Sequence, residues 1–574
     1  MSTAEGDGDG WNPGVRDVVR SVFEAYRYME MSVERYVLIV LLPGIAVAVA
    51  VAVALVLFSP PPLVAAPAVL LGVLAPTAAF VYPKIIADRK RREIRGQFHL
   101  FLTHITVLSM TNIDRVEVFR TLAGVEEYGA LAEEMGRITA LVDTWNQSLD
   151  DACRRRSERV PSELLSDFLG RMAYTVGAGQ GLDEFLLDEQ ESIIQEFVIR
   201  YESALDKLDV MKELYLSLML SVTFILVFAT VLPILIPVPP TLLLGGIIVL
   251  FGIVQAGFVF LIHNIAPKDP VWLAPESDHS PMHRVRPAIV GGVALSGLAV
   301  AGVLAVGLGL TPLASDVLPT PIYLAIPTTP LLLPGLAMRR EEQRVTERDQ
   351  GFPSFIRALG GVESVKQTST ANVLESLRKK DFGALTDNVD DLYKRLRTRI
   401  DTESSWRLFA AETGSYLIQK FGDMYVVGRR MGGEPRQLGR VISTNFNEVL
   451  RVREQRQQAT TTFVGIVYGV TAAAMFSAFI GLGVAEQMLE ITSGIAEGNE
   501  QFVDSLFSTA SYDIAVIEFL LLTVVLLNAL FSSVMIRITD RGHFVSGLPH
   551  YVALVWTGAL VATVTEIVVA GLLA

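Results

Sequence analysis

Nine apolar runs of membrane-spanning length restrict the fold of this chain more than any other feature. Because a helix rises about 1.5 Å per residue, about 20 apolar residues cross a hydrocarbon core of roughly 30 Å. Inside a bilayer, backbone polar groups must be satisfied within helices or closed barrels. The sequence therefore predicts an all-α, polytopic membrane protein. Its expected transmembrane helices cover residues 36–58, 63–82, 214–236, 241–263, 288–310, 317–338, 461–485, 514–536 and 548–573.

Two long polar segments separate these runs, and both are predicted to be helical bundles. In the first segment Phe98, Phe101, Ile105 and Leu108 recur at helical steps rather than at the alternating spacing of a strand. The expected domains are an N-terminal amphipathic segment (1–35), spans one and two (36–82), a first helical domain (83–213), spans three to six (214–338), a second helical domain (339–460) and spans seven to nine (461–574).

The two helical domains contain related glycine-rich stretches, GRMAYTVGAGQG at 170–181 and GDMYVVGRRMGG at 422–433. These stretches match at an offset of 252, whereas Phe98 matches Phe355, and Ser148 matches Ser405, at an offset of 257. We interpret this as a duplication, with a five-residue insertion or deletion between Ser148 and Gly170. The glycines expected to form helix-breaking turns are Gly170, Gly177, Gly179, Gly181, Gly422, Gly428, Gly432 and Gly433.

A long helix is expected to join each helical domain to a span. From Leu182 onward, apolar residues recur at steps of three, four and seven, and no helix breaker precedes the span that begins near Leu214. A continuous helix is therefore predicted over 182–236. The stretch 437–458 continues in a similar way toward the span at Thr461.

Charge predicts the orientation in the membrane. Arginine and lysine cluster after the second and sixth spans, whereas 486–513 contains acidic residues and no Lys or Arg. Since positive loops remain in the cytoplasm, both helical domains and the N-terminus are predicted to be cytoplasmic, and the C-terminus external.

Composition and motifs argue against catalysis, cofactors and nucleic acid. A net charge of -13 disfavours a nucleic-acid partner. The chain lacks G-x-x-x-x-G-K-[ST], H-E-x-x-H, G-x-S-x-G and C-x-x-C, so it contains no recognisable nucleotide loop, zinc motif or hydrolase nucleophile. Its single cysteine, Cys153, is expected to be a packing residue. No enzyme activity, cofactor or metal site is predicted.

The candidate functional residues are charged groups that could dock a soluble partner. Arg429 and Arg430 lie beside the second glycine stretch, far in sequence from a span, and Glu434 and Arg436 adjoin them. Arg91 and Arg92 belong to the basic cluster after the second span. That cluster admits two interpretations, an anchor for anionic lipids or part of the docking face.

The layout resembles a known family. Two helical modules, each with a glycine-containing turn before a long helix that enters the membrane, are similar to the type II secretion F domain of PilC, GspF and TadC-like platform proteins. The family's turn corresponds to GAGQG at 177–181 and MGGEP at 431–435, with Gln180 where an acidic residue is often found. Together with AYRYMEMSVERY at 25–36, two modules within nine spans are most similar to the archaeal branch, the membrane platforms of the archaellum.

This resemblance implies a non-enzymatic platform in the cell membrane. A hexameric secretion ATPase would dock on the cytoplasmic modules, filament subunits (archaellins) would bind in the membrane, and the platform would form a homodimer among membrane lipids. The platform of an archaeal adhesion pilus is an alternative. A multispan transporter using Glu518 or Glu566, and a membrane sensor with helical output domains, also stay open.

Overall fold

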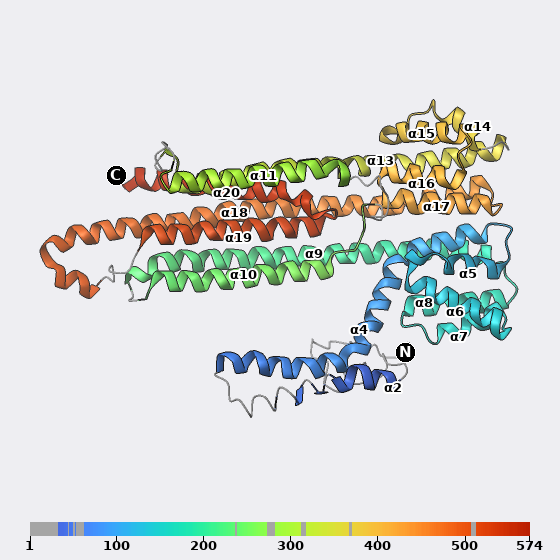
Figure 1. Ribbon diagram of the computed structural model, residues 1–574, viewed down its shortest axis with the longest axis horizontal. Coiled ribbons are helices and arrows are strands. Elements are labelled where there is room, and N and C mark those ends of the chain that lie inside the picture. Colours follow the sequence, from blue (N-terminus) through green and yellow to red (C-terminus); the bar gives the residue numbers. More distant parts are fainter. Residues whose placement is uncertain are drawn as a thin grey trace, which may run out of the picture. The chain divides into compact units, whose positions relative to one another are not determined.

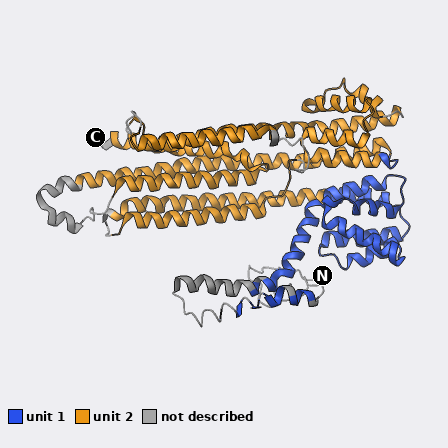
Figure 2. Ribbon diagram, viewed as in Figure 1, with its two compact units in different colours: residues 1–193, 430–433 blue, residues 194–429, 434–574 orange. Residues whose placement is uncertain are grey.

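The computed structural model describes residues 33–43, 45–46, 48–49, 52, 62–235, 238–272, 282–310, 317–366, 370–506 and 513–573. Every regular element in these ranges is a helix, apart from one isolated bridge between Trp272 and Ser415. The chain divides into two compact units (Figure 2), residues 1–193 with 430–433 and residues 194–429 with 434–574. The predicted all-α fold is confirmed. Residues 1–32, with most of the predicted amphipathic segment, lie outside the described residues.

The first unit contains a bundle that we call module 1. Its core includes Phe98 and Phe168, which are buried and meet edge to face with ring centroids 5.5 Å apart. The elements of this unit are α2 (Val33–Tyr36), the π-helix η1 (Val37–Leu41), α4 (Pro62–Ser109), α5 (Arg115–Ala123), the 3-10 helix η2 (Glu126–Tyr128), α6 (Ala130–Trp145), α7 (Leu149–Ser157) and α8 (Glu163–Gly177). The predicted span 63–82 lies in α4, which continues unbroken into module 1 (Figure 1).

The second unit contains a matching bundle, module 2. Phe355 and Phe421 are buried in its core at positions equivalent to Phe98 and Phe168. Its elements are the end of α13 (Leu332–Lys366), α14 (Thr370–Leu377), the 3-10 helix η5 (Gly383–Leu385), α15 (Thr386–Arg397), α16 (Thr402–Thr413) and α17 (Tyr416–Arg430). The two modules therefore contain the same helices in the same order.

The structure corrects the predicted alignment of the modules. The offset is 257 from Phe98 and Phe355 through the short helices η2 and η5. It becomes 253 at the capping residues Ser148 and Asp401, each of which accepts a hydrogen bond from the backbone N–H three residues later. The four-residue difference lies in α6, which has 16 residues, against 12 in α15. No five-residue insertion or deletion follows Ser148, and Ser148 is equivalent to Asp401 rather than to Ser405.

The glycine turns are shorter than predicted. Gly179 and Gly432, 253 positions apart, have φ values of +94° and +88°, which glycine adopts without strain. Gly177 ends α8, and Gly181 and Gly433 complete the two connections. The prediction was wrong for three positions, because Gly170 lies inside α8 and both Gly422 and Gly428 lie inside α17. These glycines were matched because the residue types are identical. The ends of the helices show instead which positions of the two modules are equivalent.

Each module continues directly into a long helix, as predicted. α9 (Leu182–Leu235) is one helix of 54 residues, and α18 (Pro435–Leu506) has 72 residues (Figure 1). Asp183 and Glu184 lie in the first turn of α9, where carboxylates interact favourably with the helix dipole. α18 extends well past the predicted span end at residue 485, so the predicted loop 486–513 is helical as far as Leu506.

Seven helical segments in the described residues are long and apolar enough to cross a membrane. They correspond to predicted spans three to nine. The first predicted span lies largely outside the described residues, and the second, in α4, is not among these seven segments, so the total of nine remains a prediction. Besides α9, α13 and α18, the helices of this region are α10 (Pro240–Ile265), α11 (Met282–Gly307), α12 (Thr320–Ala325), the 3-10 helix η4 (Ile326–Leu331), α19 (Ile514–Asp540), the 3-10 helix η6 (Phe544–Gly547) and α20 (Leu548–Leu573).

A buried polar network joins four of these helices. The Gln255 amide of α10 donates to Asn528 of α19 at 3.0 Å, and the Asn528 amide donates to Thr471 of α18 at 2.8 Å. Tyr215 of α9 lies 3.1 Å from the Ser532 hydroxyl of α19. Since buried polar side chains in an apolar bundle need specific partners, this network fixes how α9, α10, α18 and α19 pair.

Candidate functional site: a buried ionic junction

The most concentrated buried charge in the described residues lies in the second unit, where module 2 meets the ends of the membrane helices. Arg453 and Arg456 of α18 are 4% and 2% exposed. They are three residues apart, so they lie on one face of the helix. We call their contacts the ionic junction.

Arg453 binds two carboxylates. Its Nε donates to Asp269, in the connection after α10, at 2.8 Å, and its Nη1 donates to Asp349 of α13 at 3.0 Å. Ser415, directly before α17, also donates to Asp349. Arg541, after α19, lies 3.1 Å from Asp269. Arg453 therefore connects module 2 with the loop after α10, and Arg541 joins the end of α19 to the same carboxylate of Asp269.

The arginines determine the charge state of Asp269. Burial raises the pKa of this carboxyl, but the positive charges of Arg453 and Arg541 outweigh burial and lower the pKa from 3.8 to about 2. Since the folded-state pKa lies below the ordinary value, Asp269 stabilises the fold fully above about pH 4. That contribution is lost as the pH falls toward 2. The junction is therefore fully ionised at Asp269 near neutral pH.

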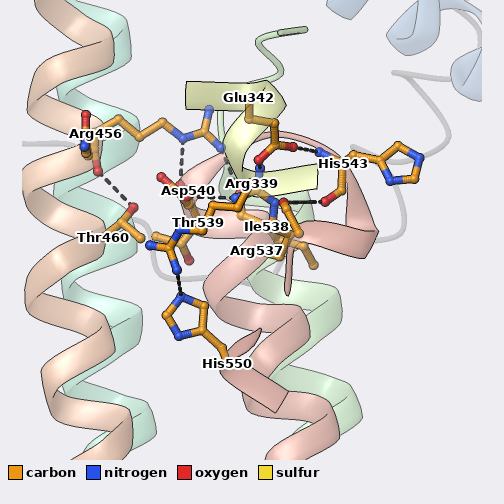
Figure 3. Close-up of polar contacts among 12 residues, drawn as sticks. Arg339, Glu342, Arg456, Thr460, Arg537, Ile538, Thr539, Asp540, His543 and His550 are labelled. Atoms are coloured by element: carbon orange, nitrogen blue, oxygen red, sulfur yellow. Dashed lines mark hydrogen bonds and ion pairs between the residues drawn. The ribbon is translucent and has the colours of Figure 1, made fainter. Parts of the chain in front are cut away.

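Arg456 binds backbone carbonyls at the ends of membrane helices. It donates to the carbonyl oxygens of Thr539 at 2.7 Å, Ile538 at 2.8 Å and Pro267 at 2.7 Å. The first two carbonyls belong to the last turn of α19, which has no further intrahelical donors (Figure 3). Arg456 thus caps α19 from the side of α18.

A second buried ion pair lies beside the ionic junction. Arg537 of α19 contacts Glu342 of α13 at 2.8 Å, and Glu342 also accepts from the backbone N–H of His543 at 2.6 Å (Figure 3). Both side chains of the pair are about one-tenth exposed. The turn between α19 and α20 is therefore attached to the same helix that carries Asp349.

The contacts of the ionic junction connect α13, α18 and the ends of α10 and α19. Removing one member of a buried ion pair leaves a charge without a partner, which costs about 3–5 kcal/mol. Loss of a single guanidinium or carboxylate from the ionic junction is therefore expected to be strongly destabilising. No three His, Cys, Asp or Glu side chains in the described ranges are placed to hold a metal ion.

The structure gives the predicted docking residues different environments. Arg429 is partly buried and pairs with Glu363 at 3.0 Å, and the Tyr425 hydroxyl donates to the same carboxylate at 2.7 Å. Glu434 accepts from the backbone N–H of Gln437 at 3.3 Å and so caps the start of α18. Arg430 and Arg436 are exposed.

Arg91 has a structural contact as well. Its Nε donates to the carbonyl of Pro161, directly before α8, at 2.9 Å. The equivalent Arg348 of module 2 donates to the carbonyl of Thr413, the last residue of α16, at 3.1 Å. Both arginines therefore bind a backbone carbonyl shortly before the helix that precedes the glycine turn. Arg92 is exposed.

Module 1 has different residues at the positions that form the ionic junction. Arg200 is equivalent to Arg453, and Arg92 is equivalent to Asp349. Arg200 pairs with Glu196 one turn earlier on its own helix, at 3.4 Å. Two arginines cannot form the pair that Arg453 and Asp349 make, so the duplicated modules differ in this contact.

The junction was missed in the sequence because its partners are far apart along the chain. Arg453 lies 184 residues from Asp269 and 104 from Asp349. One signal was available. Arg456 follows Val452 by one helical turn, so it continues an apolar stripe that runs through Val449 and Val452. An arginine on such a stripe needs a buried partner.

Comparison with known proteins agrees with this architecture. The chain is 34% identical over 527 residues to flagella accessory protein J of Methanococcus voltae, an alignment that covers 89% of this chain and 91% of the relative. It is 33% identical to the protein of the same name from Methanocaldococcus jannaschii, with 88% and 90% covered. The chain belongs to the flagella accessory protein J family. The profile of type II secretion system protein F also matches residues 101–230, from the end of α4 into α9.

Family membership sets the general role. Members are multipass membrane proteins and not enzymes, so this chain is a flagellar (archaellum) accessory membrane protein related to type II secretion systems. A more distant relative, uncharacterised protein MJ1286 of Methanocaldococcus jannaschii, is 24% identical over 147 residues. No solved structure matches the chain.

Proposed function

We propose that this protein is the membrane platform of the archaellum and couples a cytoplasmic hexameric secretion ATPase to filament assembly and rotation. In this proposal the ATPase moves the two modules, which lie in the cytoplasm, and α9 and α18 transmit the movement to the membrane. Archaellins would bind the membrane helices of a platform homodimer. The positive charge after the second and sixth predicted spans supports this orientation.

The continuity of α9 and α18 is the observation that carries the proposal. A bundle joined to a span through a flexible loop transmits little force, whereas an unbroken helix transmits both translation and rotation. At about 1.5 Å per residue, the 54 residues of α9 extend over about 80 Å. The ionic junction adds a second connection for module 2, through α13, α18 and the ends of α10 and α19.

A proline substitution tests transmission through α9. Ser203 is exposed and lies in the interior of this helix. We expect Ser203→Pro to kink α9, because proline removes a backbone N–H donor and clashes with the preceding turn, at a cost of about 3 kcal/mol. Ser203→Ala, at the same position, preserves the helix. The measurement is filament assembly in cells, with the amount of membrane-inserted protein determined in parallel.

The expected result is loss of filaments in S203P and normal filaments in S203A, with both proteins inserted in the membrane. Normal assembly by S203P would refute transmission through this helix.

Charge reversal tests the docking face. We restrict the proposed docking cations to Arg430 and Arg436, because both side chains are exposed whereas Arg429 is partly buried. We expect Arg430→Glu with Arg436→Glu to weaken capture of the purified ATPase at least about tenfold in a salt-controlled pull-down, because opposite charges across an interface become like charges. The matched control is Lys366→Glu with Lys379→Glu, two exposed lysines of the same module. Equal capture by both double variants would show that net charge, not this face, governs binding.

A further inference from the structure

An open apolar groove runs between α18 and α20 in the membrane part of the second unit. Its volume is about 430 Å³, and its lining residues are Ala472, Ala473, Phe476, Leu560, Val561, Val564 and Thr565. Gly465 and Gly469 are exposed at the preceding turns of α18, and a methyl group added at either would meet no atom within 4 Å. The groove is therefore open toward the module end of the two helices.

Three polar side chains lie at that end. His550 of α20 is 3.2 Å from the Tyr468 hydroxyl of α18 through Nδ1, and 3.4 Å from Arg339 of α13 through Nε2 (Figure 3 shows the Arg339 contact). A guanidinium can only donate, so Nε2 accepts, and the neutral ring carries its proton on Nδ1. The Tyr468 oxygen then accepts from Nδ1–H, which leaves its own O–H as a donor.

This polar end offers donors to a further partner. Arg339 is exposed and has no carboxylate partner within the described part of the chain, so most of its N–H groups stay available. The Tyr468 O–H is available as well. A set made only of donors, one of them cationic, recognises an anionic group rich in acceptor oxygens, such as a phosphate.

The polar end and the groove are in line on both helices. Tyr468, Ala472 and Phe476 follow each other at steps of four on α18, and His550, Val561 and Val564 share one face of α20. At about 1.5 Å per residue, the groove residues extend to about 12 Å from Tyr468 and about 21 Å from His550. These distances bracket the roughly 15 Å depth of one leaflet of a bilayer with a 30 Å core.

We propose that this groove binds one membrane lipid with an anionic headgroup. The headgroup phosphate accepts hydrogen bonds from Arg339 and Tyr468, and an acyl chain lies between α18 and α20 along Ala472, Ala473 and Val561. A transmembrane helix of another protein fits the polar end less well, because its backbone carbonyls are already used within the helix. The lipid would fix the distance between α20 and the long helix of module 2.

The test uses the full-length protein in nanodiscs of phosphatidylcholine and phosphatidylglycerol. Native mass spectrometry measures which lipids stay bound after release. We expect one phosphatidylglycerol molecule to be retained in preference to phosphatidylcholine. Arg339→Gln removes the cation, and Ala473→Phe fills the groove, so each is expected to lower retention about tenfold. The controls are Arg340→Gln, an exposed neighbour on the same helix, and Ala294→Phe, an exposed alanine on α11.

Several results would overturn the proposal. Equal retention by R339Q and R340Q would exclude recognition of the headgroup by Arg339. Loss in R339Q without loss in A473F would indicate a free anion rather than a lipid. A photo-crosslinking side chain at position 473, used in native membranes, is expected to label lipid. A crosslink to another membrane protein instead would make the groove a protein interface.

Discussion

Replacing Arg453 by methionine is expected to lower the free energy of unfolding by about 3–5 kcal/mol. The substitution keeps most of the side-chain volume but removes the guanidinium that lies between Asp269 and Asp349. Asp349 is 1% exposed, so its carboxylate would lose its ion-pair partner in a site that water does not reach. The measurement is thermal or denaturant unfolding of the purified protein in detergent.

Arg451 provides the matched control, because it is on the same helix and only two residues away. It pairs with Glu448 at 3.7 Å, and its side chain is 63% exposed. An exposed pair of this kind contributes about 0–1 kcal/mol, so Arg451→Met should hardly change stability. Adding Asp269→Asn and Asp349→Asn to Arg453→Met should recover part of the loss, because the buried charges are then removed. A similar loss from R451M and R453M would contradict the assigned role of the junction.

The second large effect is expected at neighbouring glycines of α13, with opposite signs. At Gly360 the backbones of α13 and α18 touch, and an added methyl group would overlap the carbonyl oxygen of Pro435. On the other helix, a methyl group at Gly439 would lie 2.8 Å from the carbonyl oxygen of Ile356. We therefore expect Gly360→Ala to destabilise module 2 by roughly 1–3 kcal/mol, the usual cost of overpacking.

Gly361 is the control for that substitution. It is next to Gly360 in the same helix, yet a methyl group there would meet no atom within 4 Å. Since glycine inside a helix is less favourable than alanine by about 1 kcal/mol, Gly361→Ala should stabilise the protein by about that amount. The two variants differ only in which side of the helix receives the methyl group. If both shift the unfolding midpoint in the same direction, close contact between α13 and α18 at Gly360 is not what limits stability.

Local sequence patterns predicted the helices well because the relevant signals are close together along the chain. The apolar spacing from Leu182, with no glycine or internal proline before Pro233, was enough to predict a continuous α9. In the same way, apolar length and charge identified the seven spans that the structure supports. These features depend on neighbours within one or two turns, which a sequence displays directly.

The register of the two modules and the ionic junction could not be predicted in this way. Ser148 and Asp401 perform the same capping function with different side chains, so identity matching joined Ser148 to Ser405 instead. Gly170 and Gly422 match by residue type, but both lie inside helices rather than in turns. The junction joins residues from several separate stretches of chain, and only the folded backbone brings Asp269 to Arg453.

The hydrogen bond between Gln255 and Asn528 implies an order in which the membrane helices assemble during synthesis. α10 leaves the ribosome long before Asn528 of α19 exists, since 273 residues separate the two side chains. Until then the amide can pair only with the Tyr215 hydroxyl of α9, 3.4 Å away, and the shorter bond to Asn528 forms once α19 has been made. The polar network of α9, α10, α18 and α19 can therefore be completed only after α19 has been made.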